Sequence, residues 1–600
     1  MKISQTFSQN ISFRLFILVI ATGFITAVCA PQENVNPADL VVLNGHILTV
    51  DDQFSEAQAV AIRDGIFIAV GENSDVEPYI GVDTRVIDAD GHTIVPGLFE
   101  SHNHFTSAVR RELRTGRPFQ QLGSIAEIQN YLREQAEQAP EGEWILLPRV
   151  DVTRIAEGRI PNSMELDEAA PNHPAVFNWQ YADRQIQILN SAALEAAGIT
   201  ANTPVPDGGS IPIGDDGRPT GRLENSGELV NRFLQRETFT EEEYRDGLVR
   251  MMNNYHKVGI TSIHDAGTND SDYRTLYSMK ENGRLSARVT LTMRMRGLDG
   301  TVEGTEAAIR GFNLEYGEGD DRLKVGPLKF RLDGGILYGT AFMREPFGDR
   351  ALEFYGLDDA EYRGTPFFTP EEVENIIATG HRMGWQMSSH VTGDAGVDRI
   401  LDGIEAVNAR FDEPVQRYKV IHGYFAHEDT AERVARLGAG IDTQPAWYYL
   451  DGDALLEPLG EDRVARFMGL QTWLDGGAKV TINSDHMQGF DPNTSLNPYN
   501  PFLTMYIAVA RRTTGGQVIG PENRVSRENA LRMMTIDAAW FDYDENKRGS
   551  IEVGKLGDLA ILTDNLMSVD EEAIKDILSI VTIVNGDIVY ECEDNRLTMQ

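Results

Sequence analysis

Short runs in which apolar and polar residues alternate occupy both ends of the chain. Two of them are broken at Asn44-Gly45 and Asp64-Gly65, and similar runs return at 558–562 and 581–590. Asn-Gly and Asp-Gly are the dipeptides favoured in tight hairpin turns. Because the two β-rich ends are far apart in the sequence, the simplest arrangement joins them in one small β-sandwich, with a first part at 38–97 and a second part at 547–600.

Between these ends, from 98 to 546, helical patterns alternate with short apolar strands. One helix begins at Thr369-Pro370-Glu371-Glu372, where a capping residue, a proline at the first helical position and early acids occur together. It leads to a strand that ends at His390. Such alternation is typical of a parallel TIM-like (β/α)8 barrel. The sequence therefore predicts an α/β fold in which this barrel carries the composite sandwich.

The composition fits a folded protein and excludes some partners. Lys and Arg number 54 against 92 Asp and Glu among 600 residues, so the formal charge is −38, while 41% of the residues are hydrophobic. This apolar content is ample for a large core. Because contacts with phosphates need clustered Lys and Arg, the acidic excess argues against nucleic acid as a partner. We expect a small-molecule substrate, and a homodimer stays open.

The first thirty residues resemble a signal peptide. Lys2 and Arg14 precede a mostly apolar run at 15–30, which is too short for a comfortable transmembrane helix. We expect residues 1–30 to direct export to the periplasm or the medium, with no stable membrane span after their removal. An uncleaved anchor is one alternative. A lipid on Cys29 is another, disfavoured by the bulky Val28 before it. With only Cys29 and Cys592 present, no disulfide framework holds the fold.

The sharpest chemical signal is a His-x-His pair at the end of an apolar strand, His102-Asn103-His104. Side chains at positions i and i+2 of a strand point to the same face, so both imidazoles can bind one metal ion. The alternative is two polar histidines on a solvated strand end.

Further polar residues end strands downstream. His390 and His422 are each followed by a glycine-containing turn, and Asp485 closes the apolar run that begins at Val480. In a βα barrel the carboxyl ends of the strands converge on one mouth, where barrel enzymes hold their chemistry. Together with His102 and His104 these residues can bind a divalent metal.

Several ordered motifs resemble the amidohydrolase superfamily, in particular the YtcJ-like group of the amidohydrolase-3 family, from about residue 38 to 590. The match covers Pro96-Gly97-Leu98 with Ser101-His102-Asn103-His104, Pro161 with Leu166-Asp167, Asn190-Ser191-Ala192-Ala193-Leu194, Gly259-Ile260-Thr261-Ser262-Ile263-His264-Asp265, Lys329-Phe330 with Asp333-Gly334, His390 with Gly393-Asp394, His422, Ser484-Asp485, and Gly549-Ser550-Ile551 with Gly554-Lys555-Leu556-Gly557-Asp558-Leu559. The resemblance implies a TIM-like metallohydrolase barrel, with a substrate-facing insertion at about 105–235, and a sandwich formed from both chain ends.

The resemblance also assigns metal ligands. It makes His102 and His104 ligands of the more buried ion, His390 and His422 ligands of a second ion, and Asp485 the acid of strand eight. Lys329 then occupies the strand-four position. Since an ordinary ammonium cannot bind a cation, a lysine ligand requires a carboxylated Lys329 that bridges two ions. The alternative is a plain lysine paired with an acid such as Asp333, with one ion. The family suggests zinc, although imidazole and carboxylate ligands accept other transition ions.

These residues imply hydrolysis of a carbon–nitrogen bond, of a linear amide in the first place. A metal-activated water attacks the carbonyl, and Asp485 takes its proton and returns it to the departing nitrogen. His264 is a candidate for stabilising the oxyanion, with a structural role as its alternative. A cyclic imide, a carbamate, an ester or a ring deamination stays open, as does a noncatalytic exported binding protein. The presence of Asp485 favours an enzyme.

Three residues are candidates for contact with the substrate. Arg184, in the insertion, could meet a substrate carboxylate, although a salt bridge with Asp183 is an equal alternative. Tyr338 is bulky and could shape the pocket, and Trp179 could line it with aromatic surface. For aromatic residues in a barrel of this size, a place in the core is the alternative.

Overall fold

The computed structural model describes residues 36–116, 118–181, 184–206, 208–234, 238–593 and 597–599. The expected signal at 1–30, with Cys29, lies outside the described residues and stays a prediction. Within the described residues, no helix combines the length and apolar character needed to span a bilayer.

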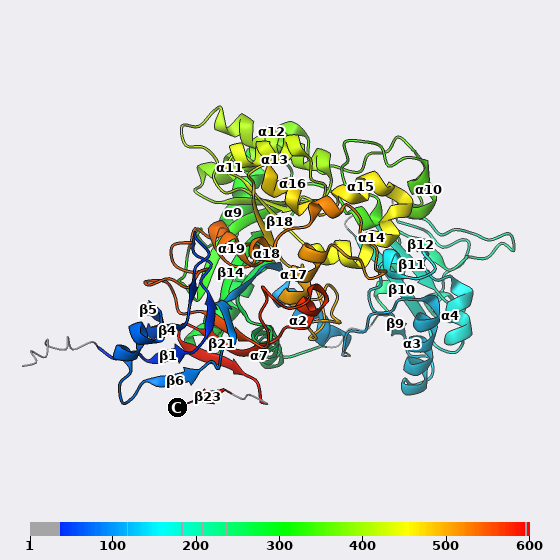
Figure 1. Cartoon of the computed structure of the whole chain (residues 1–600). Coiled ribbons are helices and arrows are strands. Elements are labelled where there is room, and N and C mark those ends of the chain that lie inside the picture. The colour runs from blue at the N-terminus through cyan, green and yellow to red at the C-terminus, as the bar shows by residue number, and fades with distance from the viewer. Residues whose placement is uncertain are drawn as a thin grey trace, which may run out of the picture. The chain divides into compact units, whose positions relative to one another are not determined.

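Eight parallel strands form the central sheet, in the order in which they occur along the chain (Figure 1). The sheet closes because the backbone N–H of Asp485 donates to the carbonyl of His102 at 3.1 Å, and the hydroxyls of Ser101 and Thr481 lie 2.9 Å apart. The predicted TIM-like barrel is confirmed. Its strands are β8 (Leu98–Asn103), β13 (Ile260–Thr268), β14 (Arg288–Arg294), β15 (Leu323–Arg331), β16 (Met387–Val391), β17 (Lys419–His422), β18 (Gly440–Thr443) and β19 (Lys479–Ile482).

Helices lie between successive barrel strands (Figure 1). The helix predicted at Thr369 is α11 (Pro370–Arg382). The Thr369 side chain accepts a hydrogen bond from the backbone N–H of Glu372, and the Thr369 backbone N–H donates to the Glu372 carboxylate. Further helices of the barrel are α7 (Glu241–His256), α8 (Asp270–Glu281), α9 (Val302–Arg310), α10 (Asp349–Tyr355), α12 (Asp394–Asn408), α13 (Glu428–Arg436), α14 (Pro445–Leu459), α15 (Glu461–Arg466), α16 (Leu470–Asp475), α17 (Pro501–Ala510), α18 (Arg527–Met533) and α19 (Ile536–Phe541).

Strands from both chain ends share two further sheets. β7 pairs antiparallel with β20, and β6 pairs antiparallel with β23, so the blue and red segments lie together in Figure 1. One apolar core contains Leu40 and Ile47 from the start of the chain and Leu559 and Ile583 from its end. The predicted composite sandwich is confirmed. Its strands are β1 (Leu40–Leu43), β2 (His46–Leu48), β3 (Glu56–Ala57), β4 (Ala59–Arg63), β5 (Ile66–Gly71), β6 (Arg85–Asp88), β7 (Thr93–Pro96), β20 (Leu559–Leu562), β21 (Ser579–Val584), β22 (Asp587–Glu591) and β23 (Thr598–Met599).

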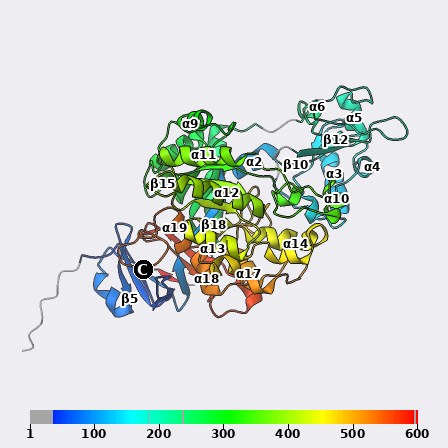
Figure 2. The same cartoon turned by 90° about the horizontal axis from the view of Figure 1, so that it is seen from above.

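A separate four-stranded sheet lies within the expected insertion, beside the barrel (Figure 2). It contains β9 (Ile145–Leu146), β10 (Ala175–Tyr181), β11 (Arg184–Leu189) and β12 (Arg222–Glu224), with α3 (Ile125–Gln138), α4 (Ser163–Ala169) and α5 (Ser191–Ala197) around it. Asn190 of the Asn-Ser-x-Ala-Leu motif caps α5 and donates to the carbonyls of Ala170 and His173. By contrast, α2 (Phe105–Thr115) packs against α7 and β13 and so belongs to the barrel.

A buried ion pair joins the barrel to the sandwich. Arg288, on β14, donates to both carboxylate oxygens of Asp558 at 2.6 and 2.8 Å, next to β20. Both side chains are nearly inaccessible to water. Burial alone would raise the pKa of Asp558, but the charge and hydrogen bonds of Arg288 lower it below its usual value.

We expect Arg288→Met to lower the free energy of unfolding by about 3–5 kcal/mol, because it leaves a buried carboxylate without its partner. Arg274→Met removes an exposed ion pair with Asp270 and should cost less than about 1 kcal/mol. Since the folded-state pKa of Asp558 is lowered, the pair stabilises above the usual aspartate pKa, and this contribution is lost as the pH falls. Urea denaturation of both variants measures the difference, and equal losses would contradict the assignment.

Candidate metal centre

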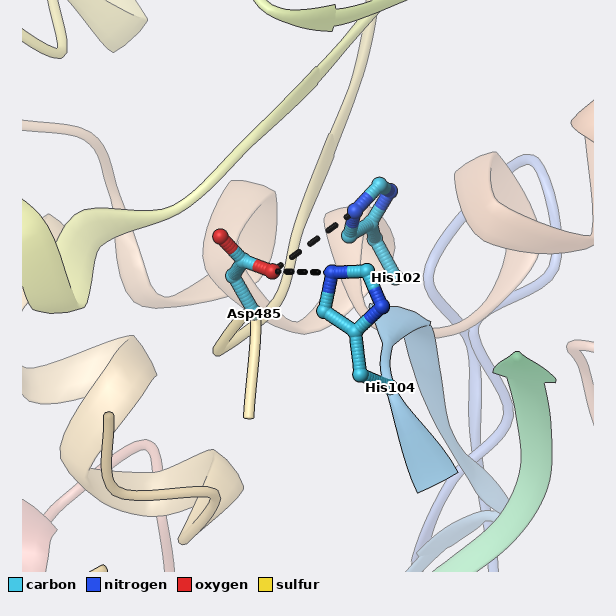
Figure 3. A group of neighbouring side chains, drawn as sticks. All are labelled: His102, His104 and Asp485. Atoms are coloured by element: carbon cyan, nitrogen blue, oxygen red, sulfur yellow. Dashed lines mark ion pairs between the residues drawn. The ribbon is translucent and has the colours of Figure 1, made fainter. Parts of the chain in front are cut away.

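His102, His104 and Asp485 meet at the mouth of the barrel (Figure 3). His102 is on β8, His104 follows this strand, and Asp485 lies just after β19. The Asp485 Oδ1 atom is 3.3 Å from His104 Nε2 and 3.7 Å from His102 Nε2. One potential ligand atom from each side chain lies within 4.8 Å of the other two, so the three can surround one cation.

Behind this group, buried charges fix the ring of His102. Its Nδ1 lies 3.4 Å from Asp442 Oδ2, and the same carboxylate oxygen is 2.8 Å from the ammonium of Lys419. With Nδ1 facing this carboxylate, the ring presents Nε2 as the nitrogen available for a metal. The Lys329 Nζ atom lies 3.3 Å from that Nε2. Lys329 therefore reaches the group from β15.

His390 and His422 lie side by side, with ring centroids 4.4 Å apart. Gln444 donates its amide N–H to the carbonyl of Asp442, so its Oε1, 2.6 Å from His422 Nδ1, accepts a hydrogen bond from that nitrogen. His390 Nε2 lies 3.0 Å from the Gly334 carbonyl and donates to it. Burial lowers the pKa of both rings below the usual value, so both are neutral at pH 7.

In these tautomers the remaining nitrogens, His422 Nε2 and His390 Nδ1, both present lone pairs and lie 2.7 Å apart. Two acceptors at this distance repel each other unless a cation lies against them. Asp485 Oδ1 is also buried and accepts no hydrogen bond of good geometry among the described residues. The donor set of imidazoles and carboxylate therefore fits a divalent metal.

Two of these residues have a backbone conformation that L side chains rarely adopt. The φ angles are +80° at His422 and +54° at Asp485. Each such residue costs on the order of 1–3 kcal/mol and persists only where its surroundings hold it, most often at functional sites. The strain supports a functional role for both side chains.

Lys329 is buried, and burial lowers the pKa of its ammonium to about 7, with a further effect from the charges of Arg294 and Arg331. A large share of the amine is then neutral at pH 7, the form that reacts with carbon dioxide to give a carbamate. Asp333, the acid expected to pair with a plain lysine, instead accepts hydrogen bonds from the backbone of Phe342 and Gly393. No ion pair joins Lys329 to Asp333 in the part of the chain that the structure describes.

Comparison with known proteins decides the family. The sequence model of the amidohydrolase family matches residues 85–590. This chain belongs to the amidohydrolase family. It is 28% identical over 564 residues to an N-substituted formamide deformylase of Arthrobacter pascens, a match that covers 92% of this chain and 98% of the relative. It is also 24% identical over 567 residues to the putative amidohydrolase YtcJ of Bacillus subtilis strain 168, covering 91% and 98%.

The fold of this amidohydrolase also occurs in a crystal structure of an uncharacterized metal-dependent hydrolase from Pyrococcus horikoshii OT3. The TM-score is 0.64 at 21% identity, over 89% of this chain and 99% of the other. The family assignment confirms the resemblance seen in the sequence. The family makes the protein a hydrolase that acts on carbon–nitrogen bonds.

His264 does not fit the oxyanion role considered for it. Its Nε2 lies 2.7 Å from Asp542 Oδ2, and its Nδ1 lies 3.3 Å from the Lys419 ammonium. Arg548 also donates to Asp542. Both ring nitrogens are therefore engaged by buried groups, and the structural alternative is the better description of this amidohydrolase.

Of the three residues considered for substrate contact, the structure describes the side chains of Trp179 and Tyr338. The side chain of Arg184 lies outside the described residues, so its role stays a prediction. Trp179 and Tyr338 are buried and stacked, with ring centroids 4.8 Å apart. The Tyr338 hydroxyl donates to Asp151 at 2.7 Å and accepts from Arg149 at 3.0 Å. The aromatic pair therefore holds the charged side chains of Arg149 and Asp151.

Sequence reasoning missed several residues that hold the ligands of the amidohydrolase centre. Asp442 and Gln444 orient His102 and His422, and Glu100 accepts from the backbone N–H of Ser484, next to Asp485. Burial raises the pKa of Glu100 to about 8, so its carboxyl is protonated at pH 7. The sequence does carry a signal for two of these residues, because Glu100 and Asp442 are acids inside otherwise apolar strands, in Phe99-Glu100-Ser101 and Gly440-Ile441-Asp442.

Proposed function

We propose that this amidohydrolase cleaves a linear amide-type carbon–nitrogen bond with Asp485 as general base and acid. The observation that carries the proposal is the buried Asp485 carboxylate beside His102 and His104. Burial alone would raise its pKa, but the imidazole of His104, whose Nε2 lies 3.3 Å from Oδ1, holds the pKa below the usual value. At neutral pH the group is therefore ionised and ready to accept a proton.

His102, His104, His390, His422, Asp485 and a carboxylated Lys329 would hold one or two ions, in the first place zinc. A bound divalent ion supplies polarisation of the carbonyl and lowers the pKa of a water from 15.7 towards about 7. Asp485 then takes the proton from the attacking water and delivers it to the nitrogen as the carbon–nitrogen bond breaks. Asp442 and Gln444 keep the rings of His102 and His422 in the tautomers that this arrangement needs.

The formamide deformylase relative suggests where to begin with substrates. We expect the purified protein to release an amine from N-substituted formamides or acetamides. Chelation should abolish the release, and zinc should restore it. The same assay with a cyclic imide, a carbamate and an ester separates the alternatives that share these ligands. No metal-dependent turnover of any of them would contradict the proposal in favour of a binding protein.

A further inference from the structure

A buried asparagine holds the backbone of Asp485. Asn497 is inaccessible to water, and its Nδ2 donates to the Asp485 carbonyl at 3.0 Å. On the other side of the same residue, the Asp485 N–H donates to the carbonyl of His102 at 3.1 Å. The peptide groups on both sides of Asp485 are therefore held. They keep the carboxylate of a residue with φ +54° beside His104 (Figure 3).

A hairpin brings Asn497 to this place. The backbone N–H of Met487 donates to the Leu496 carbonyl at 3.2 Å, and the N–H of Leu496 donates to the Gln488 carbonyl at 2.8 Å. Asp491 stabilises the turn between them, since its carboxylate accepts from two backbone N–H groups. Asn497 lies in the left-handed region, at φ +60°, which asparagine adopts more readily than most residues. The chain thereby returns to the end of β19 with the Asn497 amide beside it.

The direction of the Asn497 amide is set by an arginine of the insertion. Arg154 lies in the short helical turn η2 (Val152–Arg154), and its Nη2 donates to Asn497 Oδ1 at 3.0 Å. A guanidinium can only donate, so the amide turns its oxygen to Arg154 and its NH2 group to the Asp485 carbonyl. Arg154 therefore fixes which end of Asn497 reaches Asp485.

Arg154 is itself held between the insertion and the barrel. Its Nε and Nη2 atoms each lie 3.0 Å from a different oxygen of Asp451 on α14, and its guanidinium lies over the ring of Trp447 at 5.1 Å. The hydroxyl of Thr153 donates to the same carboxylate at 2.6 Å. The side chains of Arg154 and Asp451 are nearly inaccessible to water. Paired bonds of this kind fix both the position and the direction of a guanidinium.

We propose that Arg154 is a positioning residue of the amidohydrolase centre, which acts through Asn497 to hold Asp485 in place for proton transfer. The insertion, from which Arg154 comes, thereby helps to build the centre at the mouth of the barrel. This inference rests on the proposed amide hydrolysis and adds two residues to it that act on the backbone of Asp485.

Asn497→Gly tests the first link, because glycine tolerates φ +60° while both hydrogen bonds of the side chain are lost. At saturating zinc, we expect kcat for a cleaved formamide to fall about 10- to 100-fold, as is usual when a group that orients a metal ligand is removed, with little change in KM. The zinc affinity, measured by competition with a chelator, should fall by a similar factor.

Asn500→Gly is the matched control. Asn500 is buried in the same loop, and its amide donates to Asn493 and to the Lys575 carbonyl, away from the centre. Its replacement removes a buried asparagine of the same size and should leave both kcat and the zinc affinity as in wild type.

A mutant cycle tests the second link. Arg154→Gln together with Asp451→Asn removes the two buried charges at once, so that neither is left without its partner. We expect this pair of changes to lower kcat by at least about 10-fold. In the Asn497→Gly background it should lower kcat no further, because Arg154 acts through Asn497. Losses that multiply would contradict this link.

A wild-type kcat and zinc affinity in Asn497→Gly would overturn the inference, and so would equal losses in Asn500→Gly. If Asn497→Gly does not fold, Asn497→Asp takes its place, since an aspartate paired with Arg154 keeps the size of the side chain but cannot donate to Asp485. If wild type cleaves no amide, the proposed function fails, and zinc competition alone decides whether Asn497 holds Asp485. Weaker binding in Asn497→Gly than in Asn500→Gly supports this role, and equal binding overturns it.

Discussion

Replacement of Asp485 by asparagine is expected to reduce kcat for amide hydrolysis by about 10²- to 10⁴-fold, the usual contribution of a positioned general acid or base. Asparagine keeps the size of the side chain and one oxygen near His104, but it cannot accept and return a proton. The loss should therefore lie in kcat more than in KM. Steady-state kinetics at saturating zinc measures it, together with the metal content of the variant.

Asp537→Asn is the matched control for this experiment. Asp537 pairs with Lys479 at the opposite end of the same barrel strand, at 2.8 Å. Its replacement changes a carboxylate without touching the centre and should leave kcat unaltered. A kcat for Asp485→Asn that is also close to wild type would refute the assigned proton transfer.

Replacement of Lys329 by methionine is expected to have the second large effect. If Lys329 is carboxylated, protein prepared with ¹³C-bicarbonate should give a carbamate resonance that is absent from Lys329→Met. The metal content should fall from about two ions to one or none, since a bridging ligand is lost. We expect kcat/KM to fall by at least about 100-fold, in line with the loss of charge stabilisation at the reacting carbonyl.

Lys324→Met provides the comparison on the same strand. Lys324 donates to the Asp542 carbonyl, away from the centre, and its replacement should preserve both the resonance and the metal. If Lys329→Met also preserved the metal content and no carbamate appeared in wild type, Lys329 would be a plain lysine beside a site with one ion.

The sequence was sufficient for the barrel, the composite sandwich and the convergence of His102, His104 and Asp485. These follow from local patterns, because strand periodicity places His102 and His104 on one face and barrel topology brings strand ends together. Strand-end positions indicated His390 and His422 in the same way, and the family motifs added Lys329. The domain boundaries and the export signal stay predictions.

The supporting contacts could not be predicted in the same way. The links from Tyr338 to Arg149 and Asp151, and from His102 to Asp442, join residues far apart in the chain, and no periodicity encodes them. His264 illustrates the same limit. The sequence left an oxyanion role and a structural role open, and only the structure shows that Asp542, far along the chain, engages its ring.

The metal content of the purified wild-type protein tests the central claim most directly. Elemental analysis after preparation with zinc and bicarbonate should find about two ions per chain, as in a binuclear hydrolase centre. Chelation should remove them together with amide hydrolysis, and restored zinc should return both. A protein that binds no metal even after this reconstitution would contradict the assignment of His102, His104 and Asp485 as the catalytic centre.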